Sequence, residues 1–179
     1  MGRNGFGGFA AALVSALLAG FVAGAAAQPS SVEAQSRALE RASAATLGVR
    51  VQAVEDARSA RTLGRQRAGS GVVIAPEGLV LTIGYLVLEA DEVELVTDDG
   101  REIPARVVGY DVATGFGLVQ ALTPIRRAEA PLGVSASVRR EDPLIIMSGG
   151  TDGTASAARL VSRRDFSGYW EYHVDGALF

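Results

Sequence analysis

The chain contains few side chains able to carry acid–base or nucleophilic chemistry. Its 179 residues include no cysteine and a single histidine, His173. Without cysteine there is no thiolate nucleophile, no disulfide and no thiolate metal site. The lone imidazole further limits metal and acid–base chemistry, so we expect neither a cofactor nor a bound metal ion.

His173 and Asp175 are two residues apart on a predicted strand, so both side chains point to the same face of that strand. A carboxylate beside an imidazole forms the base half of a catalytic triad. The serine would have to come from a neighbouring strand, and Ser148, Ser156 and Ser162 are the candidates. None lies in the sharp strand-to-helix turn that exposes a nucleophilic serine. We favour a packed or surface role for His173.

Two further clusters have a catalytic or metal-binding interpretation and a structural one. Ser70 lies between two glycines, but no strand-to-helix elbow follows it, so we interpret it as a structural residue where a strand begins. The carboxylates of Asp98-Asp99-Gly100 could form a metal-binding loop. Two acidic residues beside a glycine more often form a hairpin turn, and this is the interpretation we favour.

Four arginines lie close together in the polar segment from Glu55 to Ala68, namely Arg58, Arg61, Arg65 and Arg67. Such a cluster could contact an anionic partner or a lipid surface. Nearby acidic residues partly neutralise it, which favours a solvated loop. The whole chain has a net charge of −3 and a pI near 5.2, and this acidity argues against nucleic-acid binding.

The elements that position these residues are predominantly β-strands. From Ser70 to Ala121 the chain consists of short runs of Val, Ile and Leu, interrupted at the turn sequences Pro76-Glu77-Gly78 and Asp98-Asp99-Gly100. This pattern predicts about five strands. Together with an alternating strand at 47–54, they predict a closed six-stranded barrel, in which no strand edge is left exposed. The hydrophobic fraction of 48% is sufficient for a core.

The same segment resembles the first barrel of trypsin-like serine proteases of the bacterial Deg/HtrA group. The matching stretches are, in order, 69–74 (GSGVVI), 76–78 (PEG), 80–82 (VLT), 99–102 (DGRE), 105–111 (ARVVGYD) and 114–119 (TGFGLV). Their order and spacing agree with the family pattern over about 50 residues. The resemblance implies an all-β fold of two barrels and serine endopeptidase activity.

The resemblance also assigns positions to the catalytic triad. In the family a histidine acts as general base and an aspartate orients it. The positional counterparts here are Tyr85, in Thr82-Ile83-Gly84-Tyr85, and Gly115. A phenol is a poor proton acceptor at pH 7, and glycine has no side chain to orient a base. We therefore expect no intact catalytic residue.

The remaining segments give five predicted regions. We expect a signal peptide at 1–27 with cleavage after Ala27, or an uncleaved membrane anchor. A short helix or linker at 28–45 precedes the first barrel at 46–122 and an inter-barrel connection at 123–141. A partial second barrel follows at 142–179, with predicted strands at 142–150, 155–163 and 169–174.

The predicted second barrel carries an aromatic cluster, Phe166, Tyr169, Trp170 and Tyr172, which we interpret as a packed β face rather than a binding groove. In the family, the loop with the nucleophilic serine would follow directly after Asp175-Gly176-Ala177, so we expect the triad serine and the oxyanion hole to be missing. The strand at 169–174 would then have an open edge, which a partner strand could cover.

These observations lead to one main hypothesis and two alternatives. The main hypothesis is an exported, periplasmic or secreted pseudoprotease that binds a peptide or a protein without cutting it. The first alternative is a serine endopeptidase of the family represented by an incomplete chain. The second is a decayed gene product without a maintained role. A membrane partner is expected only if the N-terminal segment is uncleaved.

Overall fold

The computed structural model describes residues 31–168 and 172–179, so the predicted signal peptide lies outside the described residues. Most of the described elements are strands. In chain order they are α1 (Ser31–Ala45), β1 (Thr46–Ala53), α2 (Ala60–Leu63), β2 (Gln66–Ala75), β3 (Leu79–Ile83), α3 (Gly84–Val87), β4 (Ala90–Val96), β5 (Glu102–Tyr110), β6 (Phe116–Ala121), the 3₁₀ turn η1 (Ser135–Ser137), β7 (Pro143–Met147), β8 (Ala155–Arg159), β9 (Arg163–Ser167) and β10 (His173–Leu178).

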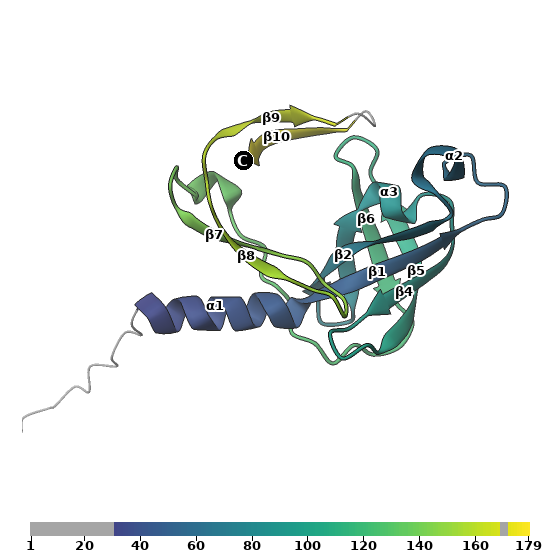
Figure 1. The fold of residues 1–179 in the computed structure, drawn as a ribbon, viewed down its shortest axis with the longest axis horizontal. Coiled ribbons are helices and arrows are strands. Elements are labelled where there is room, and N and C mark those ends of the chain that lie inside the picture. Colours follow the sequence, from purple (N-terminus) through teal and green to yellow (C-terminus); the bar gives the residue numbers. More distant parts are fainter. Residues whose placement is uncertain (1–30, 169–171) are drawn as a thin grey trace, which may run out of the picture.

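The first six strands form a closed antiparallel barrel in the order β1-β2-β3-β6-β5-β4 (Figure 1). The prediction of a closed six-stranded barrel is confirmed. Alternate residues of the strands point inward, and the core includes Leu47, Val49, Val80, Leu95 and Val119, each with no exposed surface. Closure pairs every barrel strand on both sides.

The turns of the barrel lie where the sequence predicted them. Gly78 and Gly100 have φ angles of +84° and +80°, which favour glycine. At the second turn, Thr97 N–H donates to Arg101 O at 3.0 Å. The carboxylate of Asp98 pairs with Arg127, and that of Asp99 accepts the Thr97 hydroxyl. The segment therefore forms a hairpin turn whose carboxylates already have partners.

The segment predicted as a solvated arginine loop contains regular secondary structure and is partly buried. It contains the short helix α2, and β2 begins within it at Gln66, before the predicted start near Ser70. Arg67 is only 6% exposed, so the prediction of a wholly solvated loop was wrong at this residue. Its guanidinium donates to the carbonyl oxygens of Gly64, Tyr85 and Leu88. These bonds compensate for the burial of the charge.

The second part of the chain forms two separate two-stranded antiparallel sheets, β7-β8 and β10-β9. In Figure 1 they curve around one side of the barrel. Two details differ from the sequence-based expectation: β9 was not predicted, and the strand expected at 169–174 begins only at His173 and continues to Leu178. Residues 169–171 of that expected strand lie outside the described residues. The sequence RRDFS of β9 has no apolar alternation, so only its pairing with β10 identifies it.

The loop between β7 and β8 packs directly against the barrel. Gly149 N–H donates to Ser70 Oγ at 3.0 Å. A Cβ on Gly149 would lie 2.1 Å from the carbonyl carbon of Leu47, so the two backbones are in contact. The adjacent Gly150 lies against Gly48, where a Cβ on Gly48 would be 3.0 Å from the Gly150 Cα. Ser70 therefore lies within β2 and joins the two parts of the molecule.

Helix α1 projects away from the barrel (Figure 1), and most of its length is exposed. Its C-terminal end is held because Ala45 is buried and Thr46 Oγ1 donates to Ala42 O at 2.7 Å. Among the residues that the structure describes, no helix has the length and hydropathy needed to span a bilayer.

Candidate functional site

Tyr85 lies on α3, a single helical turn that follows β3 directly. Leu86 and Val87 of this turn are 1% and 3% exposed and belong to the barrel core. Their packing holds the turn against the barrel end and turns Tyr85 outward, where it is 39% exposed. The carbonyl of Tyr85 accepts a hydrogen bond from buried Arg67 at 3.0 Å, which fixes the backbone beneath the phenol.

Gly115 lies beside this turn, in the loop between β5 and β6. Its carbonyl oxygen accepts a hydrogen bond of 2.6 Å from Gly84 N–H, one residue before Tyr85. The loop is closed by Gly115 N–H, which donates to Asp111 O at 2.8 Å. Tyr85 and Gly115, the predicted counterparts of the triad histidine and aspartate, are therefore close in space, although one lies on α3 and the other on the β5-β6 loop.

The carboxylate nearest to these positions on the loop is that of Asp111, and it stabilises the loop. It accepts hydrogen bonds from the Thr114 hydroxyl at 2.5 Å and from Ala113 N–H at 3.1 Å. These hydrogen bonds hold the pKa of Asp111 below its ordinary value, and the bond from the Thr114 hydroxyl has the largest effect. Asp111 is exposed, and its carboxylate is engaged within its own loop.

An aromatic ring from the second part of the chain fills the space beside Gly115. A Cβ on Gly115 would lie 2.7 Å from Cγ of Tyr172, too close for any side chain unless the ring moves. Gly115 also has a φ of +73°, which disfavours residues with a Cβ. The backbone N–H of His173, the residue after Tyr172, donates to Ala113 O at 2.7 Å and holds this segment on the loop.

A second tyrosine covers the start of α3. A Cβ on Gly84 would lie 1.9 Å from Cε2 of Tyr110, so the ring lies directly against the Gly84 backbone. Sequence reasoning did not assign Tyr110 or Tyr172 to this site. The available signal was the pair of glycines at 84 and 115, since a glycine often marks a place where another group approaches closely. The site thus combines phenols and backbone with no imidazole.

The alternative base pair is formed, but with a different serine from those predicted. His173 Nε2 lies 3.0 Å from Asp175 Oδ1, and His173 Nδ1 lies 2.9 Å from Ser167 Oγ. Ser148 instead contacts Thr154, and neither Ser156 nor Ser162 is bonded to the imidazole in the described chain. The three serines were candidates only, and the serine that does contact the imidazole, Ser167, lies on β9, a strand that was not predicted.

The Ser167–His173–Asp175 cluster is open to water. The side chains of His173 and Asp175 are 52% and 91% exposed. Oxyanion stabilisation requires preorganised donors in a water-excluded site, and an exposed strand face does not provide one. The geometry therefore supports a surface role for His173.

The aromatic cluster is described in part, since Tyr169 and Trp170 lie outside the described residues. Phe166 packs against Tyr172 and Phe179, with ring centroids 6.1 and 5.9 Å apart. The guanidinium of Arg164 lies 4.4 Å from the centroid of the Phe179 ring. The rings contact one another, but Phe166 and Phe179 remain 39% and 38% exposed, so the described part of the cluster lies at the surface.

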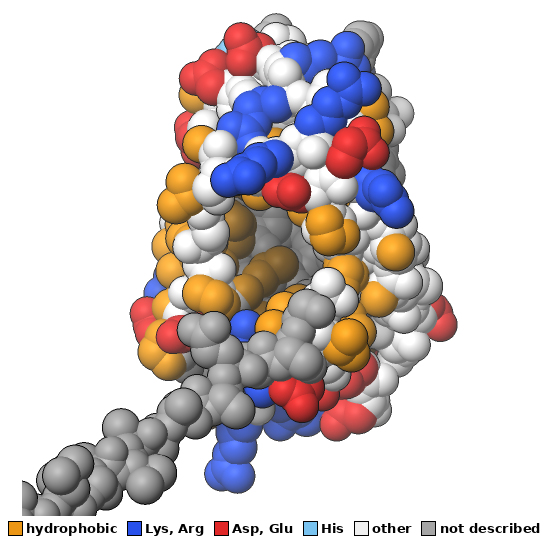
Figure 2. All heavy atoms as spheres, turned by 90° about the vertical axis from the view of Figure 1, so that its left-hand side faces the viewer, with side chains coloured by type: hydrophobic (Ala, Val, Ile, Leu, Met, Phe, Trp, Pro, Cys, Tyr) orange, Lys and Arg blue, Asp and Glu red, His pale blue; other side chains and the backbone are white. Residues whose placement is uncertain are grey.

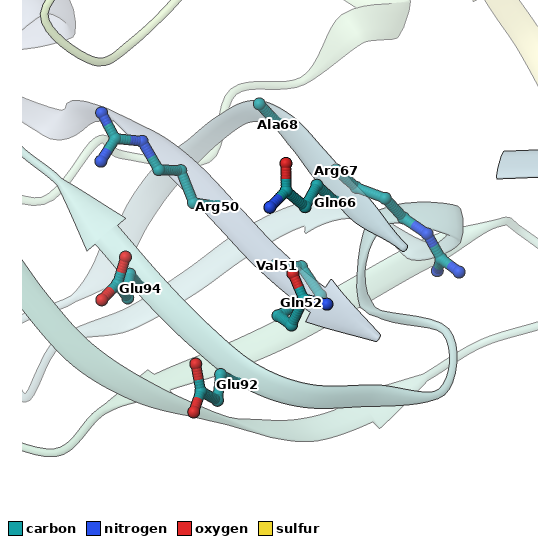
Figure 3. Close-up of a pocket in the computed structure, with 8 residues that line it drawn as sticks. All are labelled: Arg50, Val51, Gln52, Gln66, Arg67, Ala68, Glu92 and Glu94. Carbon is teal, nitrogen blue, oxygen red and sulfur yellow. The ribbon is translucent and has the colours of Figure 1, made fainter. Parts of the chain in front are cut away.

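A shallow concavity of about 410 Å³ lies elsewhere, on the outer face of β1, β2 and β4 (Figure 3). Its polar lining residues are Arg50, Gln52, Gln66, Arg67, Glu92 and Glu94. Neither Tyr85 nor Gly115 lines it. The charges in this concavity are of both signs, which gives no preference for an anionic or a cationic ligand.

Comparison with known proteins assigns the fold. The sequence profile of the trypsin-like peptidase domain matches residues 69–178, which is more than half of the chain. The chain belongs to the trypsin-like peptidase family. Within the family, the sequence relatives named below are periplasmic endoproteases of the Deg type, and the similar solved structures are HtrA-type proteases.

The probable periplasmic serine endoprotease DegP-like of Brucella suis is 36% identical over 59 residues, which are 33% of this chain and 12% of that protein. The periplasmic pH-dependent serine endoprotease DegQ of Escherichia coli is 32% identical over 75 residues, 41% of this chain and 16% of that protein. The chain therefore spans a small fraction of the length of these relatives.

Solved structures of HtrA-type proteases show the same fold. The protease AlgW with a tripeptide superposes with a TM-score of 0.64 at 24% identity, over 78% of this chain and 44% of that chain. An AlgW variant with a decapeptide superposes with a TM-score of 0.58 at 22% identity, over 72% of this chain and 45% of that chain. The trypsin-like fold expected from the sequence is thereby confirmed.

Proposed function

We propose that this member of the trypsin-like peptidase family is a noncatalytic protein that binds an extended peptide or protein segment. One observation carries the loss of catalysis: the Tyr172 ring occupies the space next to Gly115 that an aspartate side chain would need. Family proteases activate a serine through an imidazole and an aspartate. In this chain Tyr85 takes the place of the histidine, and the Tyr172 ring leaves no room for an aspartate side chain at position 115.

The binding role rests on the open strands of the second part. Ile145 and Ile146 of β7 are 48% and 64% exposed, so both faces of this strand present apolar surface. Among the described strands, β7 pairs only with β8. An extended peptide adds to such a free strand through main-chain hydrogen bonds and places alternate side chains on its apolar faces. The AlgW structures with peptides are compatible with this role.

The surface agrees with a site for apolar side chains. Figure 2 shows a hollow on the face that lies at the left in Figure 1, with hydrophobic side chains around and within it. Exposed apolar surface of this kind marks an interaction site. The periplasmic names of the relatives support a periplasmic location, reached through export by the predicted signal peptide.

The two alternatives, a serine endopeptidase and a decayed gene product, predict different properties of the chain. A serine endopeptidase represented by an incomplete chain would still carry Tyr85 and Gly115. A decayed product would be expected to lose its packing first, yet among the described residues no buried side-chain nitrogen or oxygen lacks a hydrogen-bond partner. A fully satisfied interior favours a maintained fold.

Catalysis is tested with a fluorophosphonate probe and with casein. The wild-type chain is expected to show neither labelling nor turnover. The variant Tyr85→His/Gly115→Asp/Tyr172→Ala, which removes the blocking ring and supplies a base and its orienting group, measures whether the framework retains a hidden nucleophile. Labelling of any serine in the wild-type chain would overturn the noncatalytic proposal.

Peptide binding is tested separately by fluorescence anisotropy with a labelled, valine-rich decapeptide. Ile146→Glu on β7 is expected to weaken binding at least tenfold, because it places a charge on the proposed apolar face. Val108→Glu is the matched control, since Val108 is 48% exposed on the barrel strand β5. Equal losses in both variants, or no saturable binding by the wild type, would contradict the proposed role of β7.

A further inference from the structure

The outer face of the β9-β10 hairpin brings together three side chains of metal-binding type. Asp165 comes from β9, and His173 and Asp175 come from β10. One ligand atom of each residue lies within 4.8 Å of the corresponding atom of the other two. Ligand atoms about 2.0–2.2 Å from a tetrahedral zinc ion lie about 3.3–3.6 Å apart, so side-chain rotations that bring the three groups closer complete the geometry. From this arrangement we infer that the hairpin binds a divalent transition-metal ion, with zinc as the representative case.

The strand pairing explains why these side chains meet. His173 lies directly opposite Ser167, and Val174 lies opposite Phe166. The register then shifts before Ala177, which lies opposite Arg164. Side chains alternate along each strand, so Asp165 and Ser167 share a face with His173 and Asp175. The opposite face carries Phe166, whose ring packs on those of Tyr172 and Phe179.

The imidazole is oriented for coordination. Ser167 Oγ lies 2.9 Å from His173 Nδ1, on the side away from the carboxylates. His173 Nε2 lies 3.0 Å from Asp175 Oδ1, so this nitrogen faces the cluster. A metal-binding histidine usually donates its other ring N–H to a fixed acceptor, which selects the tautomer and the ring orientation. The Ser167 hydroxyl occupies that position.

The carboxylate of Asp165 is also held in place. Its Oδ1 accepts a hydrogen bond of 2.9 Å from Gly176 N–H on the opposite strand. Gly176 has a φ of +59°, at the irregularity in the strand pairing that brings its N–H toward β9. In the inferred site, the second oxygen of this carboxylate would bind the ion. Asp165 therefore reaches across the hairpin toward the two groups of β10.

The donor set favours a transition metal over calcium or magnesium. Imidazole nitrogen suits zinc, nickel and cobalt, whereas calcium and magnesium prefer oxygen ligands only. Three protein ligands on an exposed face leave the remaining coordination positions to water. The two carboxylates offset the charge of the ion. The ion would connect β9 to β10 and stabilise a two-stranded sheet, an arrangement that is marginal by itself in water.

The site is tested by isothermal titration calorimetry on the full chain, produced without a polyhistidine tag and freed of metal. Zinc chloride is expected to bind saturably at one equivalent, and magnesium chloride is not. His173→Gln and Asp165→Asn/Asp175→Asn are expected to weaken zinc binding at least tenfold. Asp56→Asn/Asp91→Asn is the matched control, since it removes the same charge from exposed positions elsewhere.

The role of Ser167 provides an independent test. Ser167→Ala is expected to weaken zinc binding about tenfold by releasing the imidazole orientation, and Ser167→Thr, which keeps the hydroxyl, is expected to restore it. Hydrogen exchange is expected to show zinc-dependent protection of the β9 and β10 amides in the wild type and not in His173→Gln. The absence of saturable zinc binding, or binding unchanged in Asp165→Asn/Asp175→Asn, would overturn the inference.

Discussion

At the scale of single residues, the surroundings hold Tyr85 and Gly115, the proposed counterparts of the triad histidine and aspartate. Tyr85 is fixed from below by Arg67, and Gly115 is held by both its φ angle and the Tyr172 ring. Introducing an aspartate side chain at Gly115 therefore meets steric resistance, whereas the Tyr85 side chain is exposed. The packing at position 115 fits a glycine and not a carboxylate side chain.

Gly115→Asp is expected to destabilise the fold by about 1–3 kcal/mol, from backbone strain and from overlap with the Tyr172 ring. Urea unfolding measures the loss. In the double variant with Tyr172→Ala the overlap is absent, so the two losses are expected to be less than additive. Strict additivity would show that the ring does not occupy the space beside Gly115.

Glu89 links the 55–65 segment to the end of α3. Its carboxylate accepts the Ser59 hydroxyl at 2.5 Å and Ser59 N–H at 2.8 Å. These hydrogen bonds lower the pKa of Glu89 from its ordinary value near 4.5, and the bond from the Ser59 hydroxyl has the largest effect. A lowered pKa in the folded state means that the carboxylate stabilises the fold above that ordinary value. The contribution disappears as the pH falls through the lowered pKa.

Glu89→Gln is therefore expected to be less stable than the wild type at neutral pH, and the difference is expected to shrink below about pH 4. Urea unfolding at several pH values measures both. A difference that stays constant down to acid denaturation would show that the charge of Glu89 makes no contribution. Ser59→Ala removes the hydroxyl that donates to Glu89, so it is also expected to make the free energy of unfolding depend less on pH.

At the scale of elements, the arginine in β2 is an internal connector. The guanidinium of Arg67 donates to three backbone carbonyls and, at 2.7 Å, to Ser59 Oγ. Burial lowers the pKa of Arg67, but an arginine stays protonated at neutral pH. These bonds join β2, the α2 loop and α3 into one unit. The position of Tyr85 depends on this unit.

Arg67→Lys is expected to destabilise the chain by about 1.5–3 kcal/mol, because a single ammonium cannot reach acceptors arranged around a planar fork. The measurement is urea unfolding. Arg106→Lys is the matched control, since Arg106 is an exposed strand residue on β5. Equal stability of the two variants would contradict the connecting role of Arg67.

At the scale of the whole molecule, the second part is attached to the barrel at two places. Gly149 of the β7-β8 loop packs on Leu47 of β1 and on Ser70 of β2, and the segment around Tyr172 packs on the 111–115 loop. The first contact relies on glycine, because the backbones are too close for a Cβ. The second contact places the hairpin with the inferred metal site next to Gly115.

Gly149→Ala is expected to separate the β7-β8 loop from β1, because its Cβ would overlap the Leu47 backbone. Limited trypsin digestion should then cut faster at Arg139, Arg140 and Arg159 while the barrel remains resistant. Gly133→Ala is the control, since a Cβ there meets nothing within 4 Å. Equal cleavage rates in the two variants would show that the close backbone contact is not needed for docking.

Local sequence determined the first barrel. Turn residues at 76–78 and 98–100 and the alternation of apolar residues between them specify where strands begin and end, since both depend on neighbours along the chain. Tyr85 and Gly115 were likewise visible as departures from a family pattern. These features need no knowledge of distant contacts.

Only the tertiary structure showed which distant groups meet. The burial of Arg67, the place of the Tyr172 ring beside Gly115 and the pairing of β9 with β10 depend on contacts between residues far apart in sequence. No local pattern marks such contacts: Arg67 lies among other arginines, and β9 has the composition of a loop. The Asp165–His173–Asp175 cluster exists only because strand pairing places one carboxylate across from the other two groups.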